Sequence, residues 1–458
     1  MNITKLIVKK LFGRFDYEID FSNKKLLIIT APNGYGKSTI LKIIKSFVDS
    51  DYIYFINENF QSIEFTFDNN KKVFIQKIRN YEGTLFDDVF EEEDFDLKNN
   101  ATSIEIYSDE NKYIINAENY ERKVERFERM LPVTRLDRDL WLDDRSNEVY
   151  SFNEMLNKFK ESRLIQDSLE LPHWLINITT QLKIEYISTN RLLSVDYIIP
   201  RRNRAENYNK LMVDVIAKEI KDEIDKEIKK QFNEGRKRET SFPTRLMEAL
   251  EENEEIHDSE IKDLITQIQE YESKYLSLDI VPDTGSTKQL GTSKFVSSMD
   301  QSVSAGRIVL KTYLNDVIEK FKLLDDLAKK LTLFSKSIND LMSFKKLSIS
   351  SEKGFVIKTY KSDPDKYNYI VPLSSLSSGE QHLLVLLGKL IFAQKNNGLI
   401  LIDEPEISLH PEWQESLLDI LSSIQTISNF EILIATHSPI LIGDRWDDVI
   451  ELRDQVVN

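Results

Sequence analysis

The chain has 458 residues, of which 41% are hydrophobic, a formal net charge of −16 and no cysteine. This length suits two or three domains with real hydrophobic cores, and the lack of cysteine excludes disulfides, thiol catalysis and cysteine metal sites. The charge argues against uniform, nonspecific coating of nucleic acid but leaves room for a local basic channel. No apolar run approaches the ~18 residues of a membrane span, and no signal peptide opens the chain. We therefore expect a cytoplasmic protein without a membrane partner.

Residues 2–78 predict a β-rich lobe, because apolar and β-branched runs alternate with Asn, Asp and Lys turns. The predicted strands are 3–8, 15–21, 52–56, 63–67 and 72–78. Within the lobe, the apolar run 26–30 predicts a buried parallel strand, and the residues after Lys37 follow a helical pattern. The segment between them, 31–39, reads APNGYGKST. A glycine loop between a strand and a helix is the context of a phosphate-binding P-loop.

The P-loop residues have separate predicted roles. Gly34 and Gly36 let the backbone approach phosphate oxygens, and the N–H groups at the helix start carry positive potential. Lys37 should reach the β- and γ-phosphates of ATP, and Ser38 should hold Mg²⁺. The predicted nucleotide contacts in this loop are Asn33, Gly34, Gly36, Lys37, Ser38 and Thr39. Ala31 replaces the first glycine of the usual pattern, which most turn geometries tolerate. The length of the loop, with a lysine and a hydroxyl directly after it, argues against an ordinary strand-to-helix turn.

Residues 200–345 predict a helical insertion. One apolar stripe comprises Ile216, Ile220, Ile224, Ile228 and Phe232, and the longest runs through residues 310–341. Such spacing suits helices packed as a hairpin or bundle, and glycine-containing segments at 285–287 and 291–293 predict a loop between two arms.

Clusters of charge in the chain allow more than one interpretation. Two basic clusters could line a nucleic-acid channel or form a solvated helix surface. They are Arg201, Arg202 and Arg204, and Lys229, Lys230, Arg236, Lys237 and Arg238. The acidic stretch 87–94 predicts a loop face rather than a metal site, because no glycine-spaced ligand pattern accompanies it.

A second glycine loop, LSSGEQ at 376–381, precedes the apolar helical run 382–392. Ser377 and Gly379 at a helix N-terminus predict another anion-binding site. The alternative is a linker with a capping box, since Ser377 and Glu380 have the spacing of one. Both interpretations can hold at once.

Two later apolar runs predict strands that end in residues suited to hydrolysis. Asp403 follows the strand 399–402, where open α/β sheets place ligand groups, and would hold Mg²⁺ directly or through water. Glu404 cannot point the same way along an extended chain and is the candidate general base for the attacking water. His437 follows the strand 432–435 and is the candidate sensor of the γ-phosphate. The alternatives are a solvated acidic pair and a structural histidine.

These motifs, in this order, resemble the ABC ATPase superfamily in its SMC/RecF-like branch. The stretch 403–414, DEPEISLHPEWQ, is similar to OLD-like ATPases (AAA_15/AAA_21-like) found in anti-phage systems. The resemblance covers roughly residues 1–60 and 345–445. It implies that Ser377 and Gly379 contact the γ-phosphate of ATP held by the opposite protomer, and that the stretch 408–410 is a D-loop at the dimer interface.

The resemblance also suggests further nucleotide contacts. Arg14 resembles the arginine that SMC-like heads place near the nucleotide. The glutamine that links ATP to the helical lobe would be Gln61 or Gln76, unless both are plain surface residues.

The expected fold class is α/β: an ABC-type P-loop ATPase head with a β-rich lobe and a helical insertion. The expected domains are the N-terminal part of the head (1–199), the helical insertion with oligomer and partner contacts (200–345) and the C-terminal part of the head (346–458). The insertion is too long for a transporter ATPase and too short for a chromosome-organising SMC protein.

The resemblance predicts Mg²⁺-dependent ATP hydrolysis in a homodimer or higher homo-oligomer that acts as a sensor or scaffold in anti-phage defence. Only about 20 residues follow His437, which leaves no room for the TOPRIM domain of OLD-family nucleases. We therefore expect a separate effector nuclease subunit of TOPRIM or HNH type and a phage trigger protein, by similarity to AriA of PARIS or PtuA of Septu. Two alternatives stay open: a RecF-like repair or recombination ATPase that acts directly on DNA, and a structural clamp that hydrolyses ATP rarely.

Overall fold

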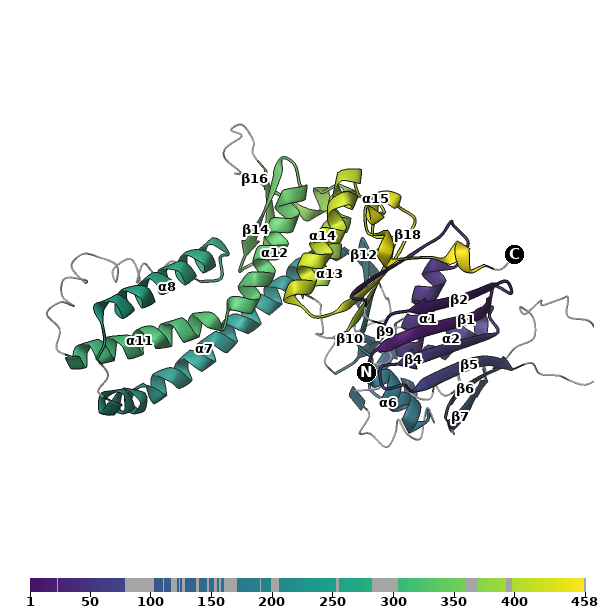
Figure 1. Ribbon diagram of the computed structural model, residues 1–458, viewed down its shortest axis with the longest axis horizontal. Helices are drawn as coiled ribbons and strands as arrows, with labels where there is room; N and C mark the ends of the chain where they lie inside the picture. Colours follow the sequence, from purple (N-terminus) through teal and green to yellow (C-terminus); the bar gives the residue numbers. More distant parts are fainter. Residues whose placement is uncertain are drawn as a thin grey trace, which may run out of the picture. The chain divides into compact units, whose positions relative to one another are not determined.

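The computed structural model describes the chain outside residues 23, 79–102, 110, 117–121, 123, 126–127, 137–139, 146–147, 152–154, 156–157, 160–170, 190, 199–205, 253–254, 282–303, 360–368, 393–397 and 457–458. The chain divides into two compact units (Figure 1). Unit 1 comprises Met1–Asn190, Tyr197–Glu206 and Gln394–Asn458, and unit 2 comprises Arg191–Asp196 and Asn207–Ala393. The acidic stretch 87–94, the basic cluster 201–204 and the glycine segments at 285–293 lie outside the described residues. The three predicted domain ranges stay predictions.

Unit 1 contains a parallel sheet, and the predicted site residues lie at the C-terminal ends of three of its strands. Its strands, in spatial order, are β11 (Ile184–Ile187), β17 (Leu399–Asp403), β18 (Glu431–Thr436), β3 (Leu26–Thr30) and β19 (Val449–Glu451). Thr436 pairs with Thr30, and Asp403 pairs with Ala435. Because parallel strands in register end at the same edge, the residues that follow β3, β17 and β18 meet there. The three strands predicted at 26–30, 399–402 and 432–435 are confirmed.

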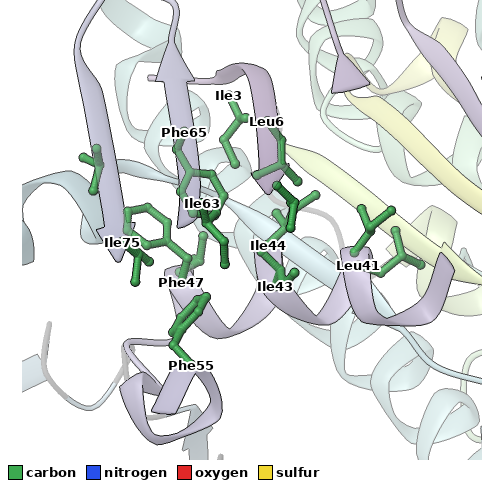
Figure 2. Packing of buried hydrophobic residues seen from close by; sticks show 14 of the residues in the cluster. Ile3, Leu6, Leu41, Ile43, Ile44, Phe47, Phe55, Ile63, Phe65 and Ile75 are labelled. Atoms are coloured by element: carbon green, nitrogen blue, oxygen red, sulfur yellow. The ribbon is translucent and has the colours of Figure 1, made fainter. Parts of the chain in front are cut away.

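An antiparallel sheet forms the second layer of unit 1. Its strands, in spatial order, are β2 (Phe15–Asp20), β1 (Ile3–Leu11), β4 (Ser62–Phe67), β5 (Lys72–Ile78), β6 (Ser103–Ser108) and β7 (Asn111–Asn116). Helix α1 (Lys37–Val48) contacts this sheet on one side and strands of the parallel sheet on the other. In Figure 2, apolar side chains of α1 face those of β1, β4 and β5, and the Phe47 and Phe65 rings stack with centroids 4.3 Å apart. This packing fixes the helix that begins at the P-loop.

The β-rich lobe is largely as predicted, with one error. The strands expected at 3–8, 15–21, 63–67 and 72–78 are present, but residues 52–56 belong to helix α2 (Tyr52–Asn57). The Asp51 carboxylate accepts a hydrogen bond from the Tyr54 N–H at 3.3 Å and caps this helix. Tyr52, Phe55 and Ile56 are buried, which is the spacing of one helical face rather than of a strand.

Smaller elements complete unit 1. They are α6 (His173–Gln181), α14 (Pro411–Ile427), α15 (Pro439–Ile442), the 3₁₀ helices η2 (Trp446–Asp448) and η3 (Leu452–Gln455), and the sheet of β8 (Val133–Arg135), β9 (Leu140–Asp143) and β10 (Glu148–Ser151).

Unit 2 is built around long helices. They are α7 (Met212–Glu252), α8 (Asp258–Ser277), α11 (Ser304–Lys322), α12 (Asp325–Leu341) and α13 (Ser378–Phe392). Helix α11 packs against both α7 and α8, and the three lie side by side in Figure 1. The insertion is not helical from its predicted start, because residues 206–211 form strand β13 (Glu206–Leu211), which pairs with β12 (Leu193–Ile198).

The apolar stripe predicted on α7 is correct only in its first half. Ile216, Ile220 and Ile224 are fully buried, whereas Phe232 is 63% exposed. A strict four-residue spacing turns by about 40° per step around a helix of 3.6 residues per turn, so Phe232 lies about 160° from Ile216. Beyond Ile224, contacts of α7 with α11 include a polar one, in which Gln231 Nε2 donates to the Lys320 carbonyl. Apolar packing returns near the end of α7, where Leu246 and Leu250 pack against a cluster that includes Leu314 of α11.

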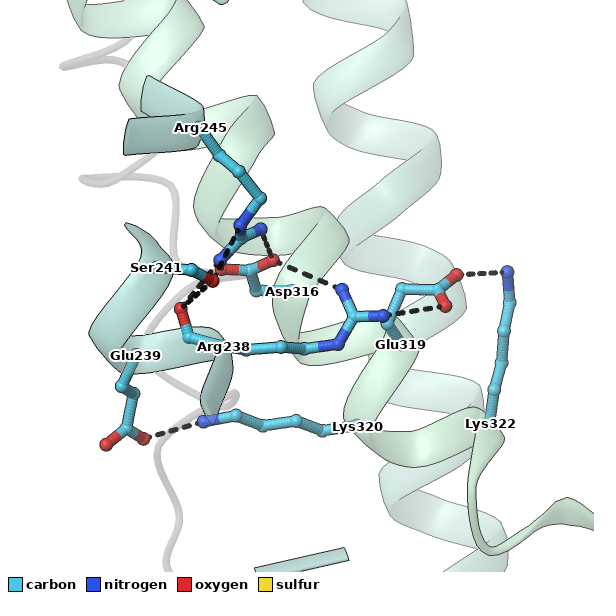
Figure 3. Close-up of polar contacts among 8 residues, drawn as sticks. All are labelled: Arg238, Glu239, Ser241, Arg245, Asp316, Glu319, Lys320 and Lys322. Carbon is cyan, nitrogen blue, oxygen red and sulfur yellow. Dashed lines mark hydrogen bonds and ion pairs between the residues drawn. The ribbon is translucent and has the colours of Figure 1, made fainter. Parts of the chain in front are cut away.

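Ion pairs join α7 to α11 (Figure 3). Asp316 of α11 is only 7% exposed and accepts a hydrogen bond from Arg245 Nη2 at 2.7 Å. Arg238 lies 3.6 Å from Asp316 and 3.3 Å from Glu319. Arg238, a member of the predicted basic cluster, is therefore engaged in joining two helices of unit 2.

Close packing in unit 2 holds the helix that follows the second glycine loop. A Cβ on Gly388 of α13 would lie 2.3 Å from Ile216 Cγ2 of α7, so glycine allows these helices to approach. An antiparallel sheet of β14 (Lys345–Ser350), β15 (Gly354–Thr359) and β16 (Tyr369–Val371) precedes this loop, and the 3₁₀ helix η1 (Leu373–Ser375) connects them.

Candidate nucleotide site

The loop between β3 and α1 has the backbone of a phosphate cradle. Gly34 and Gly36 have φ angles of 92° and 84°, which favour glycine. A Cβ on Gly36 would also lie 2.9 Å from Leu11 Cδ2, so the wall of the loop excludes a side chain there. Ala31 lies outside the left-handed region, which explains why alanine is tolerated in place of the first glycine. Buried Lys37 donates from Nζ to the Ala31 carbonyl at 2.7 Å, which is the kind of contact that a phosphate oxygen can replace.

A serine and an aspartate meet at the C-terminal edge of the parallel sheet. Ser38 Oγ donates to Asp403 Oδ1 at 2.8 Å, and the Tyr186 hydroxyl of β11 donates to Oδ2 at 3.3 Å. Burial raises the pKa of Asp403, and the hydrogen bonds from Ser38 and Tyr186 oppose this shift. Hydroxyl and carboxylate oxygens suit Mg²⁺, which is commonly held by one or two protein oxygens together with substrate phosphates. Sequence reasoning missed Tyr186, because no motif surrounds it.

The segments after β17 and β18 bring two carboxylates to one histidine. His437 Nδ1 lies 3.5 Å from Glu404 Oε1 and 3.3 Å from Glu406 Oε1. Glu404 has a φ of 44°, a conformation that costs a non-glycine residue about 1–2 kcal/mol. The Glu404 N–H donates to the Ala435 carbonyl at 2.8 Å, so the neighbouring strand holds this turn. The predicted base and the predicted phosphate sensor are therefore adjacent.

Glu406 was not predicted as a site residue. Its side chain is 5% exposed, and its Oε1 accepts hydrogen bonds from the Thr436 hydroxyl at 2.5 Å and from the His437 N–H at 3.0 Å. The available signal was a further acid two positions after Glu404, within the sequence DEPE.

Hydrogen bonds connect the segment 408–410, the predicted D-loop, to the residues that follow β18. The Ser438 hydroxyl donates to Gln414 Oε1 at 2.7 Å, and Gln414 Nε2 donates to the Leu409 carbonyl at 3.0 Å. The Ser438 N–H donates to Thr436 Oγ1 at 3.0 Å. The segment 408–410 is therefore tied to the residues that surround Glu406.

The remaining predicted contacts of unit 1 are exposed or half-buried. Arg14 lies in the turn after β1, where its N–H donates to the Leu11 carbonyl at 3.1 Å. Gln61 is exposed just before β4, and Gln76 is exposed on β5, where it pairs with Ser62. Asn33 is also exposed, and Thr39 is half-buried in the first turn of α1. The nucleotide roles of these residues stay predictions.

The second glycine loop, in unit 2, forms a capping box at the start of α13. The Ser377 N–H donates to Glu380 Oε2 at 2.8 Å, and the Glu380 N–H donates to Ser377 Oγ at 3.3 Å. Lys345 Nζ contacts both oxygens of Glu380, at 2.7 and 2.8 Å. Burial raises the pKa of Glu380, but the hydrogen bonds from Lys345 and Ser377 outweigh it and leave the pKa lowered. The capping-box prediction is confirmed, and Gly379 is buried beside it.

The fold and site together define a P-loop ATPase of the ABC type. The family AAA_21, described as "AAA domain, putative AbiEii toxin, Type IV TA system", matches residues 28–443, and the chain belongs to it. The predicted α/β ATPase fold is thereby confirmed. Membership in this family implies the use of a nucleotide, usually with Mg²⁺.

Curated relatives match a short part of the chain. Retron Ec83 probable ATPase from Escherichia coli is 33% identical over 86 residues, which are 16% of this chain and 16% of that protein. Protein ea59 of Escherichia phage lambda is 36% identical over 72 residues, 16% of this chain and 14% of that protein. Retron Vc95 probable ATPase from Vibrio cholerae serotype O1 biovar El Tor is 26% identical over 97 residues, 19% of this chain and 18% of that protein. The chain thus spans less than a fifth of the length of these relatives.

Solved structures of SMC heads show weak overall similarity. The Smc head domain with an extended coiled coil bound to the C-terminal domain of ScpA, derived from Pyrococcus furiosus, has a TM-score of 0.35 and 13% identity, covering 99% of this chain and 94% of that one. The SMC head domain from Thermotoga maritima has a TM-score of 0.33 and 12% identity, covering 96% and 91%. Scores at this level carry no argument about function.

The described residues contain neither a membrane-spanning helix nor a cluster of metal-binding side chains. No described helix is both long and apolar enough to cross a membrane. Within the same residues, no group of three or more His, Cys, Asp or Glu side chains could hold a metal ion.

Proposed function

We propose that the chain hydrolyses ATP with Mg²⁺ at composite sites of a homodimer or higher homo-oligomer, and that it acts as the sensor or scaffold of a separate effector nuclease in anti-phage defence. The observation that carries the proposal is the convergence of Lys37, Ser38, Asp403, Glu404 and His437 at one edge of the parallel sheet.

Each residue at this edge has a distinct proposed role in hydrolysis. Lys37 binds the β- and γ-phosphates in place of the Ala31 carbonyl. Ser38 and Asp403 hold Mg²⁺, which when bound neutralises charge on the phosphates. Glu404 orients the attacking water and accepts its proton. His437 senses the γ-phosphate through the ring edge opposite the Nδ1 atom that faces the carboxylates.

The loop at Ser377 supports a site completed by a second copy of the chain. Its hydroxyl and the N–H groups at the start of α13 are suited to bind an anion. The P-loop already supplies a helix N-terminus for the phosphates of one nucleotide, so one chain does not need two. We assign Ser377 and Gly379 to the γ-phosphate of ATP bound by the other protomer.

Complementation between two inactive variants tests this assignment. Lys37→Ala disables the cradle and Ser377→Arg disables the loop, so a mixed dimer keeps one intact site. Mixing equal amounts should restore about a quarter of the wild-type ATPase rate, because half of the dimers are mixed and each has one of two sites intact. The measurement is steady-state phosphate release after subunit exchange, which differently tagged subunits can verify.

The matched control mixes Lys37→Ala with Glu404→Gln. Both changes lie in the same half of the site, so the mixed dimer has no intact site and should stay inactive. If the Lys37→Ala and Ser377→Arg mixture is no more active than the control even after its subunits have exchanged, that result would contradict the assignment of Ser377 to the nucleotide of the other protomer.

The proposed effector partnership rests on the family and on unit 2. The family description includes a toxin and a type IV toxin–antitoxin system, and two relatives are named as ATPases of retrons. Helices α7 and α11 also expose large apolar side chains of the kind that mark partner surfaces. They are Phe232, Met247, Val309 and Tyr313, with exposed fractions of 63%, 60%, 39% and 51%.

Capture of the partner tests this second part of the proposal. Tagged protein isolated from its native cells should recover a nuclease subunit, identified by mass spectrometry. Replacing Phe232, Met247 and Tyr313 by serine should reduce the capture at least tenfold while ATP binding stays unchanged, because these side chains are not part of the unit 2 core.

Exposed apolar residues of unit 1 provide the matched control. Ile114→Ser with Trp446→Ser removes side chains that are each 53% exposed and should leave the capture intact. Recovery of the chain alone, without any nuclease, would contradict the effector partnership. If the variant with serines on α7 and α11 captures the nuclease as well as the wild type does, the nuclease binds elsewhere on the chain.

The alternative of a RecF-like ATPase that acts directly on DNA has less support. Lys226, Lys230 and Lys237 of α7 each pair with the glutamate three residues earlier, at 3.0, 3.1 and 2.5 Å. Arg238 pairs with Asp316 and Glu319. These partners neutralise much of the basic face that DNA would need.

A further inference from the structure

The region around His437 contains one carboxylate that the ATPase roles above do not use. Glu406 is 5% exposed and belongs to the turn after β17, two residues beyond the proposed base. Its Oε1 receives the Thr436 hydroxyl at 2.5 Å and the His437 N–H at 3.0 Å. Two donors from the end of β18 therefore fix this oxygen in place.

The same oxygen faces the imidazole of His437. His437 Nδ1 lies 3.3 Å from Glu406 Oε1 and 3.5 Å from Glu404 Oε1. An ionised carboxylate only accepts hydrogen bonds, so a hydrogen bond from the ring to either carboxylate requires the proton on Nδ1. The hydrogen bond of one ring nitrogen sets the role of the other, which leaves Nε2 as the atom available to substrate.

The two carboxylates differ in their exposure to solvent. The Glu406 side chain is 5% exposed and anchored by the two donors from β18, whereas the Glu404 side chain is 19% exposed. Glu406 Oε2 is buried and accepts no hydrogen bond within the described part of the chain. Burying a carboxylate oxygen in this way is unfavourable for folding, so stability alone does not account for the glutamate.

We propose that Glu406 is a positioning residue: it accepts the Nδ1 proton of His437, fixes the imidazole ring with Nε2 directed to the γ-phosphate, and leaves Glu404 to act on water. This inference rests on the role of His437 in the proposed function. The Ser438 N–H donates to Thr436 Oγ1, and the Ser438 hydroxyl donates to Gln414. Gln414 Nε2 donates in turn to the Leu409 carbonyl, so these bonds extend the support toward the segment 408–410.

A double-mutant cycle tests the proposal. Glu406→Gln keeps an acceptor for the Thr436 hydroxyl and the His437 N–H but removes the charge opposite Nδ1. It should lower kcat about tenfold with KM within about twofold, and His437→Ala should lower kcat at least as much. The double variant should match His437→Ala, because Glu406 acts only through the ring. Single-turnover assays with excess protein keep slow variants measurable.

The outcomes of the cycle are separable. A wild-type kcat in Glu406→Gln, or a further tenfold loss when it is added to His437→Ala, would overturn the positioning role and leave the proposed function standing. A wild-type kcat in His437→Ala would instead contradict the role of His437 in the proposed function. Glu431→Gln, the same change at the start of β18, is the matched control and should keep the wild-type kcat.

A spectroscopic test does not depend on ATP turnover. The chain has only five histidines, so ¹⁵N-histidine labelling with the His437→Ala variant as a reference identifies the signal of His437. In the nucleotide-free protein its Nδ1 should be protonated, and Glu406→Gln should shift the signal toward a mixture of tautomers. A His437 signal unchanged by Glu406→Gln would overturn the proposal, and unchanged thermal unfolding would show that the fold is intact.

Discussion

Replacing Glu404 by Gln is expected to lower ATP hydrolysis about 10²–10⁴-fold, the range that a positioned general base supplies. Gln has nearly the same shape and can occupy the turn, but its amide cannot accept a proton from water. The phosphate contacts proposed for Lys37 and the glycine loop do not involve Glu404, so ATP binding should survive. The variant should therefore accumulate an ATP-bound dimer, measured by single-turnover hydrolysis and by size-exclusion chromatography with light scattering.

Glu415→Gln is the matched control for this experiment. Glu415 is exposed on α14, eleven positions after Glu404, and its replacement makes the same chemical change. It should hydrolyse ATP at the wild-type rate and show no accumulated dimer. Turnover of Glu404→Gln at the wild-type rate would show that another group, Glu406 or a phosphate oxygen, takes the proton.

The assembly of the site could be predicted because each motif follows a strand of the same parallel sheet. Buried runs at 26–30, 399–402 and 432–435 identify the strands, and strands in register deliver the next residues to one edge. The contact between Ser38 and Asp403, 365 positions apart in sequence, follows from this rule. The sequence predicted that both residues hold Mg²⁺, although it did not predict their direct hydrogen bond.

Residues that support the site from outside a motif could not be predicted in the same way. Tyr186 reaches Asp403 because β11 lies beside β17, and the order of strands in a sheet is not written in any one segment. Glu406 depends on the sharp turn at Glu404, whose positive φ is unusual for a glutamate. Such backbone conformations arise from the surrounding fold rather than from local propensity.

Periodicity failed where local patterns were ambiguous. Residues 52–56 are aromatic and β-branched and so suggest a strand, but the cap at Asp51 and burial of one helical face produce α2. On α7, the predicted apolar stripe takes every fourth residue as far as Phe232. A helix has 3.6 residues per turn, so every fourth residue moves gradually off the buried face, and Phe232 is exposed. In both cases tertiary contacts decided between patterns that the sequence left open.

Replacing Lys37 by Ala is expected to remove most of the ATP binding seen at concentrations that saturate the wild-type protein. Lys37 is 5% exposed, and its Nζ donates to the Ala31 carbonyl at 2.7 Å and lies 3.4 Å from the Pro32 carbonyl. ATP would exchange these neutral acceptors for charged phosphate oxygens, and hydrogen bonds to charged groups contribute about 1.5–3 kcal/mol each. Losing contacts to both phosphates should weaken binding at least about a hundredfold.

Thermal unfolding with and without ATP measures this loss. Ligand at 100 times its Kd stabilises a protein by about 2.7 kcal/mol, so ATP should raise the Tm of the wild type. The Tm of Lys37→Ala should rise far less, because a Kd raised a hundredfold leaves only about 0.4 kcal/mol of stabilisation at the same ATP concentration. Lys45→Ala removes the same charge from the last turn of α1, where the lysine pairs with Asp49, and should keep the shift. An equal shift in Lys37→Ala would show that the glycine loop binds ATP without its lysine, and hydrolysis by that variant would contradict the assignment of the cradle.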